Sequence, residues 1–351
     1  MLNNVCDSNN KNNQTKVAII TEADEHIATG HLKESLVLAE ELDKCQCAAA
    51  LWINQDVPGQ FLTGISKEYY VYQRPIYNGI DDVLSFMKKE NINLVIFNLR
   101  EIANELIKKI KEVSMIEILC IDEFGHRRLD CDIIVNPMID KYYGKYEGGY
   151  KQILIGNQYL ILPPRYYEWH RKDRVIHKKI EKVTISMGGV DRNNTTQKIV
   201  KWMQASNFDS IEIYVVLGGG YAWELELRQS IKNENIHIFR NINFLDELFW
   251  NSDLAFCAGG NTLHELACMG TPAVIIPSMP HEYRNGKAFE AKGFGKCYQN
   301  FAEFEKDVSN SFFYLFNYEN RINQMEAGKS CSDGGGYLRM VDLINNMKEC
   351  F

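Results

Sequence analysis

The sequence lacks both an excess of basic residues and a long apolar run. Its 351 residues carry 39 Lys and Arg against 46 Asp and Glu, a formal net charge of −7. This balance argues against a broad nucleic-acid surface. No stretch approaches the roughly 20 apolar residues of a transmembrane helix. Residues 1–16 are polar and Asn-rich and lack an apolar signal core, so we expect a disordered tail and a cytoplasmic protein.

A cysteine spacing typical of zinc sites is also absent. Most of the ten cysteines lie in apolar patterns, as Cys120, Cys257 and Cys268 do. Cys45 and Cys47 are too close together to form a CxxC pair. This distribution is typical of buried free thiols. We therefore expect neither a metal site nor a bound cofactor.

Apolar strands and amphipathic helices alternate along the chain, and the pattern begins twice. Such alternation indicates βαβ units and parallel sheets. We predict one domain over 17–165 and a second over 166–351, with the final helix packing back on the first. The charged, aromatic segment 166–179 is read as the linker. Predicted strands cover 17–20, 47–52, 93–99, 116–122, 132–137, 151–156, 182–189, 211–220, 235–240 and 272–277, and predicted helices cover 31–42, 79–91, 101–113, 195–205 and 223–232.

The run from Ala258 to Glu265 places two glycines, a hydroxyl residue and a glutamate between a strand and a helix. A glycine turn at a helix N-terminus exposes backbone N–H groups and the positive end of the helix dipole, which suits a phosphate. A glutamate one turn further can accept hydrogen bonds from ribose hydroxyls. The alternative is a turn used only for packing. Glycines at 188–189 and 218–220 also follow strands, so these loops are expected to converge on one cleft between the domains.

Taken in order, these motifs resemble a known family. ATGHLKESLVLAEEL, IDEFGHRRLDCDIIVNP, YLILPPRYY, SMGGVDRNN, VVLGGG, AGGNTLHELACMGTPAVII and SDGGGYLRMVDLI resemble successive segments of the PseG/SpsG group of UDP-sugar hydrolases in pseudaminic acid synthesis. MurG-type glycosyltransferases are more distant relatives of that group. The resemblance implies a GT-B fold, with two Rossmann-like, doubly wound parallel-sheet domains and a cleft between them.

The resemblance also implies roles for individual residues. His31 corresponds to the histidine understood as the base that activates water, and a helix N-terminus favours its neutral form; without the resemblance, His31 reads as a capping or core histidine. Glu265 would hold the ribose. The alternative to nucleotide binding is a purely structural role: a tight turn at Gly188 and Gly189, and a helix cap at Thr262. The implied nucleotide-binding set is Gly30, Gly188, Gly189, Gly218, Gly259, Gly260, Asn261, Thr262, Glu265 and Asn285, the last in an expected loop at 281–285.

The first domain departs from the family pattern beside the proposed base. Glu34 stands where the family has an arginine, and Ala28 replaces the first glycine of its motif. A glutamate cannot make the bidentate contact of an arginine, and it tends to raise the pKa of a nearby histidine. Asp122 and Glu123 end a strand, where they either orient sugar hydroxyls or cap a turn. We therefore expect Glu34, Asp122 and Glu123 on the sugar side of the cleft.

Three functions fit this sequence. The first is hydrolysis of a UDP-linked amino or deoxy sugar at its anomeric carbon, with inversion, in nonulosonic-acid or surface-glycan synthesis. The second is a GT-B glycosyltransferase, in which an acceptor hydroxyl replaces water. The third is a nucleotide-sugar binder without activity. For each of these three functions, the expected ligand is a nucleotide sugar and not a nucleic acid. The sequence predicts no oligomeric state.

Overall fold

The computed structural model describes most of the chain. The described residues are 16–23, 30–45, 47–53, 70–73, 80–123, 125, 128–138, 146–206, 208–240, 242 and 245–348. The predicted tail over 1–16 lies outside them except for Lys16, as does Ala28.

The first domain is built on a seven-stranded parallel sheet in the order β3-β2-β1-β4-β5-β6-β7. An edge strand at 70–73 was not predicted. Successive strands are added to one side of β1 up to β3 and then to its other side from β4 onward. The point between β1 and β4, where the strand order reverses, is where doubly wound folds bind ligands. The elements are β1 Lys16–Thr21, α1 Gly30–Lys44, β2 Ala48–Ile53, β3 Tyr70–Gln73, α2 Ile80–Glu90, β4 Leu94–Asn98, α3 Asn104–Val113, β5 Glu117–Ile121, β6 Ile133–Asn136 and β7 Gln152–Ile155.

Both faces of this sheet are covered by helices. Side chains alternate along a strand, so Val17 and Ile19 of β1 pack with α1, while Ala18 and Ile20 pack with α2 and α3. Burial on both faces explains why the strands read as continuous apolar runs instead of alternating ones.

The second domain repeats the design with six parallel strands in the order β10-β9-β8-β11-β12-β13. Its reversal point lies between β8 and β11. The predicted α/β architecture of two doubly wound parallel sheets is thus confirmed. The elements are α4 Pro164–His170, β8 Lys182–Ser186, α5 Thr195–Ala205, β9 Glu212–Leu217, α6 Glu224–Ser230, β10 Ile236–Arg240, α7 Leu245–Trp250, β11 Leu254–Cys257, α8 Asn261–Met269, β12 Ala273–Ile275, α9 Pro280–Ala291, β13 Lys296–Cys297, α10 Phe301–Phe316 and α11 Tyr318–Cys331.

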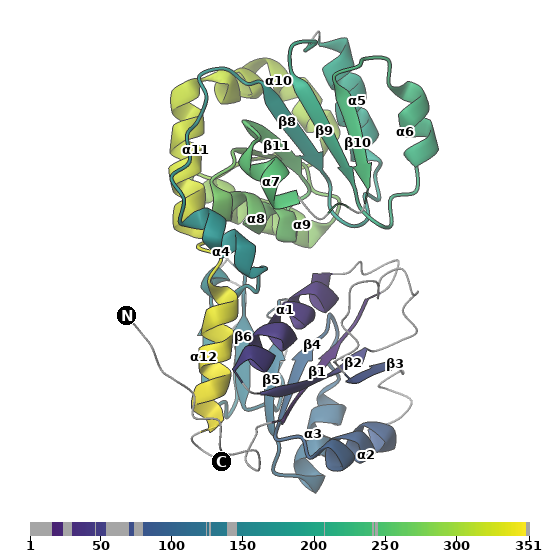
Figure 1. Ribbon diagram of the computed structural model, residues 1–351, viewed down its shortest axis with the longest axis vertical. Coiled ribbons are helices and arrows are strands. Elements are labelled where there is room, and N and C mark those ends of the chain that lie inside the picture. Colours follow the sequence, from purple (N-terminus) through teal and green to yellow (C-terminus); the bar gives the residue numbers. More distant parts are fainter. Residues whose placement is uncertain are drawn as a thin grey trace.

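The chain crosses between the domains twice (Figure 1). At the first crossing, α4 packs against the second domain, where Tyr166 joins an apolar cluster with Leu266. At the second crossing, helix α12 (Gly336–Lys348) returns to the first domain, where Met340 and Ile344 pack with Leu38 of α1. The two crossings therefore lie side by side and connect the domains along one edge.

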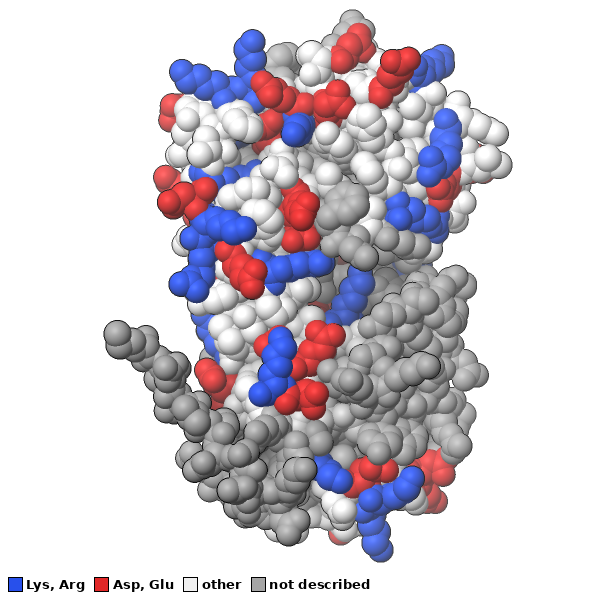
Figure 2. Space-filling model, viewed as in Figure 1, with Lys and Arg blue, Asp and Glu red and all other residues white. Residues whose placement is uncertain are grey.

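The charged surface is mixed. On the face drawn in Figure 2, lysine and arginine side chains are interspersed with aspartate and glutamate over the described parts of both domains. Within the described ranges, none of the helices combines the length and the apolar character that a bilayer crossing requires.

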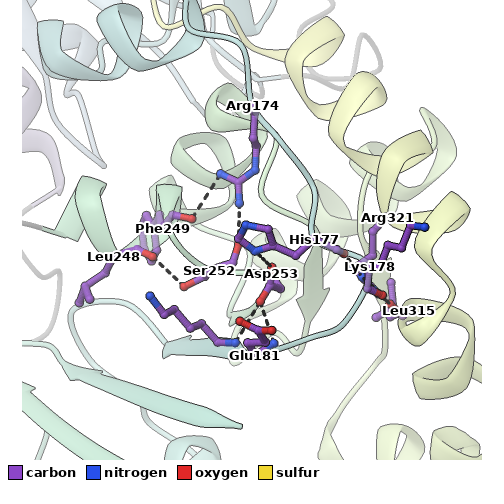
Figure 3. A network of polar contacts seen from close by, with 11 residues as sticks. Arg174, His177, Lys178, Glu181, Leu248, Phe249, Ser252, Asp253, Leu315 and Arg321 are labelled. Atoms are coloured by element: carbon purple, nitrogen blue, oxygen red, sulfur yellow. Dashed lines mark hydrogen bonds and ion pairs between the residues drawn. The ribbon is translucent and has the colours of Figure 1, made fainter.

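A polar network fixes the linker to the second domain (Figure 3). The Asp253 carboxylate accepts hydrogen bonds from the backbone N–H groups of Glu181 and Lys182, at 2.8 and 3.0 Å. The Arg321 guanidinium, from α11, donates to the carbonyl oxygens of His177, Lys178 and Leu315, at 2.6, 3.1 and 2.9 Å. Two buried charged side chains, Asp253 and Arg321, thus form hydrogen bonds with backbone groups that have no partner in a strand or helix.

We expect the substitution Arg321→Met to lower the free energy of unfolding by about 3 kcal/mol, because it leaves three carbonyl oxygens, one of them on the buried Leu315, without this donor. Arg321 is 0% exposed. Equilibrium unfolding in urea measures the change. Arg228→Met is the matched control, since Arg228 forms a helical ion pair with Glu224 and its side chain is 51% exposed. Equal unfolding midpoints for the two variants would contradict the structural role given to Arg321.

Candidate functional site

A cavity of about 390 Å³ lies between the domains, where the carboxyl ends of both sheets face each other. The first domain contributes the start of α1 and the residues after β4 and β5. The second contributes the loops after β8, β9 and β11 and the starts of α8 and α9. The predicted residues that line it are Gly30, His31, Glu34, Glu123, Gly188, Gly189, Gly218, Gly260, Asn261, Thr262 and Glu265.

The first turn of α8 forms one wall of this cavity. Gly259 has φ +109°, and a Cβ atom there would lie 2.6 Å from the carbonyl oxygen of Glu282. Only glycine fits this turn. Asn261 and Thr262 then open the helix and line the cavity. The first N–H groups of a helix have no partner within it, so this wall suits an anion.

The loops after β8 and β9 meet backbone to backbone beside α8. A Cβ atom on Gly218 would lie 2.2 Å from the carbonyl oxygen of Gly188. The N–H group of Gly220 donates to the carbonyl oxygen of Gly189 at 3.0 Å. The packing of the two loops therefore requires glycine at 218. As a result, this part of the cavity is lined by backbone atoms, which a ligand can approach closely.

Glu265 lies one helical turn beyond the start of α8 and lines the same cavity. Burial raises the pKa of its carboxyl group, while Lys33 of α1 and the side chain of Tyr166 oppose that shift. Glu265 therefore lies at the cavity wall where the family resemblance implies a residue that holds the ribose.

The expected loop at 281–285 is instead the first part of helix α9. Pro280 suits the first turn of a helix, and the Glu282 carboxylate accepts hydrogen bonds from the N–H groups of Ser278 and Met279 at 2.8 and 3.0 Å. Asn285 is buried and donates through Nδ2 to the carbonyl oxygen of Gly259 at 2.6 Å. It thus stabilises the glycine turn through this hydrogen bond. Asn285 is not among the described residues that line the cavity, where the family resemblance implied it would be.

His264 lies beside Asn285, with its Nε2 3.3 Å from the Asn285 Nδ2. Burial lowers its pKa to about 4, and its ring packs edge-on against Phe289 at 4.8 Å between centroids.

His31 lies on the opposite wall, between two carboxylates. Its Nδ1 is 3.5 Å from Oε1 of Glu22, and its Nε2 is 3.6 Å from Oε2 of Glu123. Burial alone lowers the pKa of His31, but the two carboxylates outweigh it and raise the pKa to about 10. The imidazole is therefore protonated near neutral pH, whereas the predicted role as a base needs the neutral ring.

Glu34 bridges the two walls. Its Oε1 accepts a hydrogen bond from Asn261 Nδ2 at 2.7 Å, and its Oε2 accepts one from Asn98 Nδ2 at 3.3 Å. The residue is 4% exposed. Burial, reinforced by the charge of Glu123, raises its pKa to about 7. The departure from the family pattern thus lies where the two domains are in contact within the cavity lining.

The neighbours Asp122 and Glu123 have different roles. Asp122 is buried, and its carboxylate accepts hydrogen bonds from the N–H group of Gly125 at 3.1 Å and the Tyr146 hydroxyl at 3.0 Å. It therefore stabilises the turn after β5, as one of the two sequence interpretations holds. Glu123 lines the cavity beside His31.

Glu22, Asn98 and Arg100 are not among the site residues that the sequence predicts. Glu22 follows β1 directly, and its carboxylate accepts a hydrogen bond from the N–H group of Arg100. A polar residue immediately after a buried strand at the reversal point was the available indication. In the part of the chain that the structure describes, no three His, Cys, Asp or Glu side chains are grouped to hold a metal ion.

Known proteins resemble this chain in sequence and in fold. Residues 184–332 match the model of the glycosyltransferase family 28 C-terminal domain. The spore coat polysaccharide biosynthesis protein SpsG of Bacillus subtilis is 23% identical over 340 residues, which are 95% of this chain and 98% of SpsG.

Two solved structures illustrate the likeness in fold. MurG of Acinetobacter baumannii superposes with a TM-score of 0.69 at 13% identity, covering 95% of this chain and 99% of MurG. The complex of S. aureus MnaA with UDP has a TM-score of 0.64 at 12% identity, covering 96% of this chain and 98% of MnaA. The protein therefore has a GT-B fold, and residues 184–332 of its second half resemble the C-terminal domain of glycosyltransferase family 28.

Proposed function

We propose that this protein transfers a sugar from a nucleoside-diphosphate donor to an acceptor hydroxyl in the interdomain cavity. One observation carries the proposal. The first turn of α8, a helix start suited to an anion, faces a cluster of carboxylates and an imidazolium across the same cavity, and Asn261 and Glu34 are hydrogen-bonded there at 2.7 Å.

The nucleotide would occupy the second-domain wall. The N–H groups at Asn261 and Thr262 would hold the diphosphate, Glu265 would accept hydrogen bonds from the ribose, and the glycine loops would let the backbone approach. A uridine nucleotide is proposed because MnaA, which shares the fold, was solved with UDP.

The sugar would then lie toward the first domain, with its anomeric carbon near His31 and Glu34. In the reaction, the acceptor oxygen bonds to the anomeric carbon as the bond from that carbon to the diphosphate oxygen breaks. Negative charge develops on the leaving diphosphate. Helix-start N–H groups and the His31 cation would stabilise that charge, and because the fold already holds these groups in place, little reorganisation would be needed.

Hydrolysis of the same bond is the second candidate, because Glu34 is only 4% exposed. A water molecule reaches so enclosed a group more readily than a large acceptor does. In this form the substrate would be a UDP-linked amino or deoxy sugar, as in nonulosonic-acid synthesis. The similarity to SpsG, whose name refers to spore coat polysaccharide, fits either form within surface-glycan synthesis.

Release of UDP from a panel of UDP-sugars, measured with and without glycan acceptors, separates these functions. We expect UDP to appear only when an acceptor is present, because transfer needs the acceptor hydroxyl. UDP released at the same rate without an acceptor would indicate hydrolysis. Binding of UDP-sugars without release under either condition would contradict both enzymatic functions.

A further inference from the structure

Resting on the proposed function, we propose that Glu34, and not His31, is the base that removes the proton from the attacking hydroxyl. Three groups of the first-domain wall are candidates for this step: His31, Glu123 and Glu34. All three line the cavity. They differ in their partners and in how readily each accepts a proton.

His31 cannot accept a proton while it is already protonated. The carboxylates of Glu22 and Glu123 lie on either side of its ring, 3.5 and 3.6 Å from the two nitrogens. Between two negative groups the imidazolium is the stable form. His31 therefore supplies positive charge to the cavity instead of a lone pair.

Glu123 is the weaker of the two carboxylate candidates. Burial raises its pKa, but the adjacent His31 outweighs that effect and lowers it below the ordinary value. A carboxylate of low basicity is a poor proton acceptor at neutral pH. Glu123 thus stays ionised, which suits stabilisation of positive charge on the sugar ring.

Glu34 has the opposite environment. It is one helical turn beyond His31 on α1 and is enclosed between the domains. Its pKa of about 7 matches the pH at which a general base is most effective. Two carboxylates with their pKa values moved apart are the usual arrangement for dividing such roles. The charge of His31 lowers the pKa of Glu34, whereas the charge of Glu123 raises it. The other charged or titratable groups that line the cavity are Lys33, Arg100, Arg192, Glu265, His281 and Glu282.

The contacts of Glu34 place it at the reacting centre. Asn261, its partner at 2.7 Å, is the first residue of the helix proposed to hold the diphosphate. A group bound there is adjacent to the diphosphate–sugar bond. In the step, a Glu34 oxygen takes the proton of the attacking hydroxyl, the hydroxyl oxygen bonds to the anomeric carbon, and the electron pair of the broken C–O bond leaves on the diphosphate.

The pH dependence of UDP release tests this role. For the wild type, we expect kcat/KM to rise as the pH increases through about 7, because Glu34 must be ionised. For Glu34→Gln, we expect kcat to fall about 100- to 10,000-fold and the rise near neutral pH to disappear. UDP affinity, measured by calorimetry, should change little, since the amide can still bond to Asn261.

Glu282→Gln is the matched comparison, because Glu282 lines the same cavity and burial also raises its pKa to about 7. Its carboxylate caps α9, so we expect this variant to keep the rise in kcat/KM near pH 7. A rise that persists in Glu34→Gln, or that vanishes only in Glu282→Gln, overturns the role of Glu34 and leaves the proposed function standing. A wild type that releases no UDP from any sugar nucleotide, with or without acceptor, overturns both.

Discussion

The substitution His31→Gln is expected to lower the turnover of a nucleotide sugar about 100- to 1000-fold, the usual cost of removing one preorganised group that stabilises developing charge. His31 is the cation between Glu22 and Glu123. Without it, the carboxylates of Glu22 and Glu123 lose the cation between them, and the negative charge on the leaving diphosphate is opposed. Steady-state kinetics of UDP release measure the loss.

His237→Gln is the control for this prediction. His237 also pairs with a glutamate, at 2.6 Å from Glu212, but on β10, and its side chain is 41% exposed. We expect its turnover to match that of the wild type. If His31→Gln keeps more than about a tenth of wild-type turnover, the charge-stabilising role of the imidazolium is refuted.

The second large effect is expected for Gly259→Ala, on nucleotide binding. The new Cβ would lie 2.6 Å from the Glu282 carbonyl oxygen, at a φ of +109° that side chains rarely adopt. The turn must shift, and the N–H groups of the first turn of α8 shift with it. We expect the Kd for UDP to rise more than about 10-fold, or about 1.4 kcal/mol, by titration calorimetry.

Gly149→Ala provides the comparison, because a Cβ atom at Gly149 meets nothing within 4 Å. That variant should bind UDP as the wild type does. Equal affinities for the two alanine variants would show that the turn after β11 does not shape the binding wall.

The sequence predicted the features of the fold that depend on local pattern. Apolar runs flanked by helices indicated most strands of both sheets, although not β3, and glycines after strands indicated the loops that meet at the cavity. The two-residue strand Lys296–Cys297 is too short to produce a pattern. The loop expected at 281–285 is wrong, because these residues belong to helix α9. Pro280 and Glu282 are typical of a helix start, so the local pattern already favours a helix there.

The electrostatics of the site could not be predicted from local pattern. Glu34 and Asn261 are 227 residues apart, and their contact depends on how the two domains pack. Glu22 and Glu123 reach His31 from two different strands of one sheet. The pKa of a histidine at a helix start is expected to fall; Glu22 and Glu123, with a smaller contribution from the local Glu34, reverse that effect.

A crystal structure with bound UDP tests the central claim most directly. The account predicts the diphosphate within hydrogen-bonding distance of the N–H groups of Asn261 and Thr262, with the ribose hydroxyls at Glu265. UDP bound elsewhere, or a diphosphate that contacts neither N–H group, would contradict it.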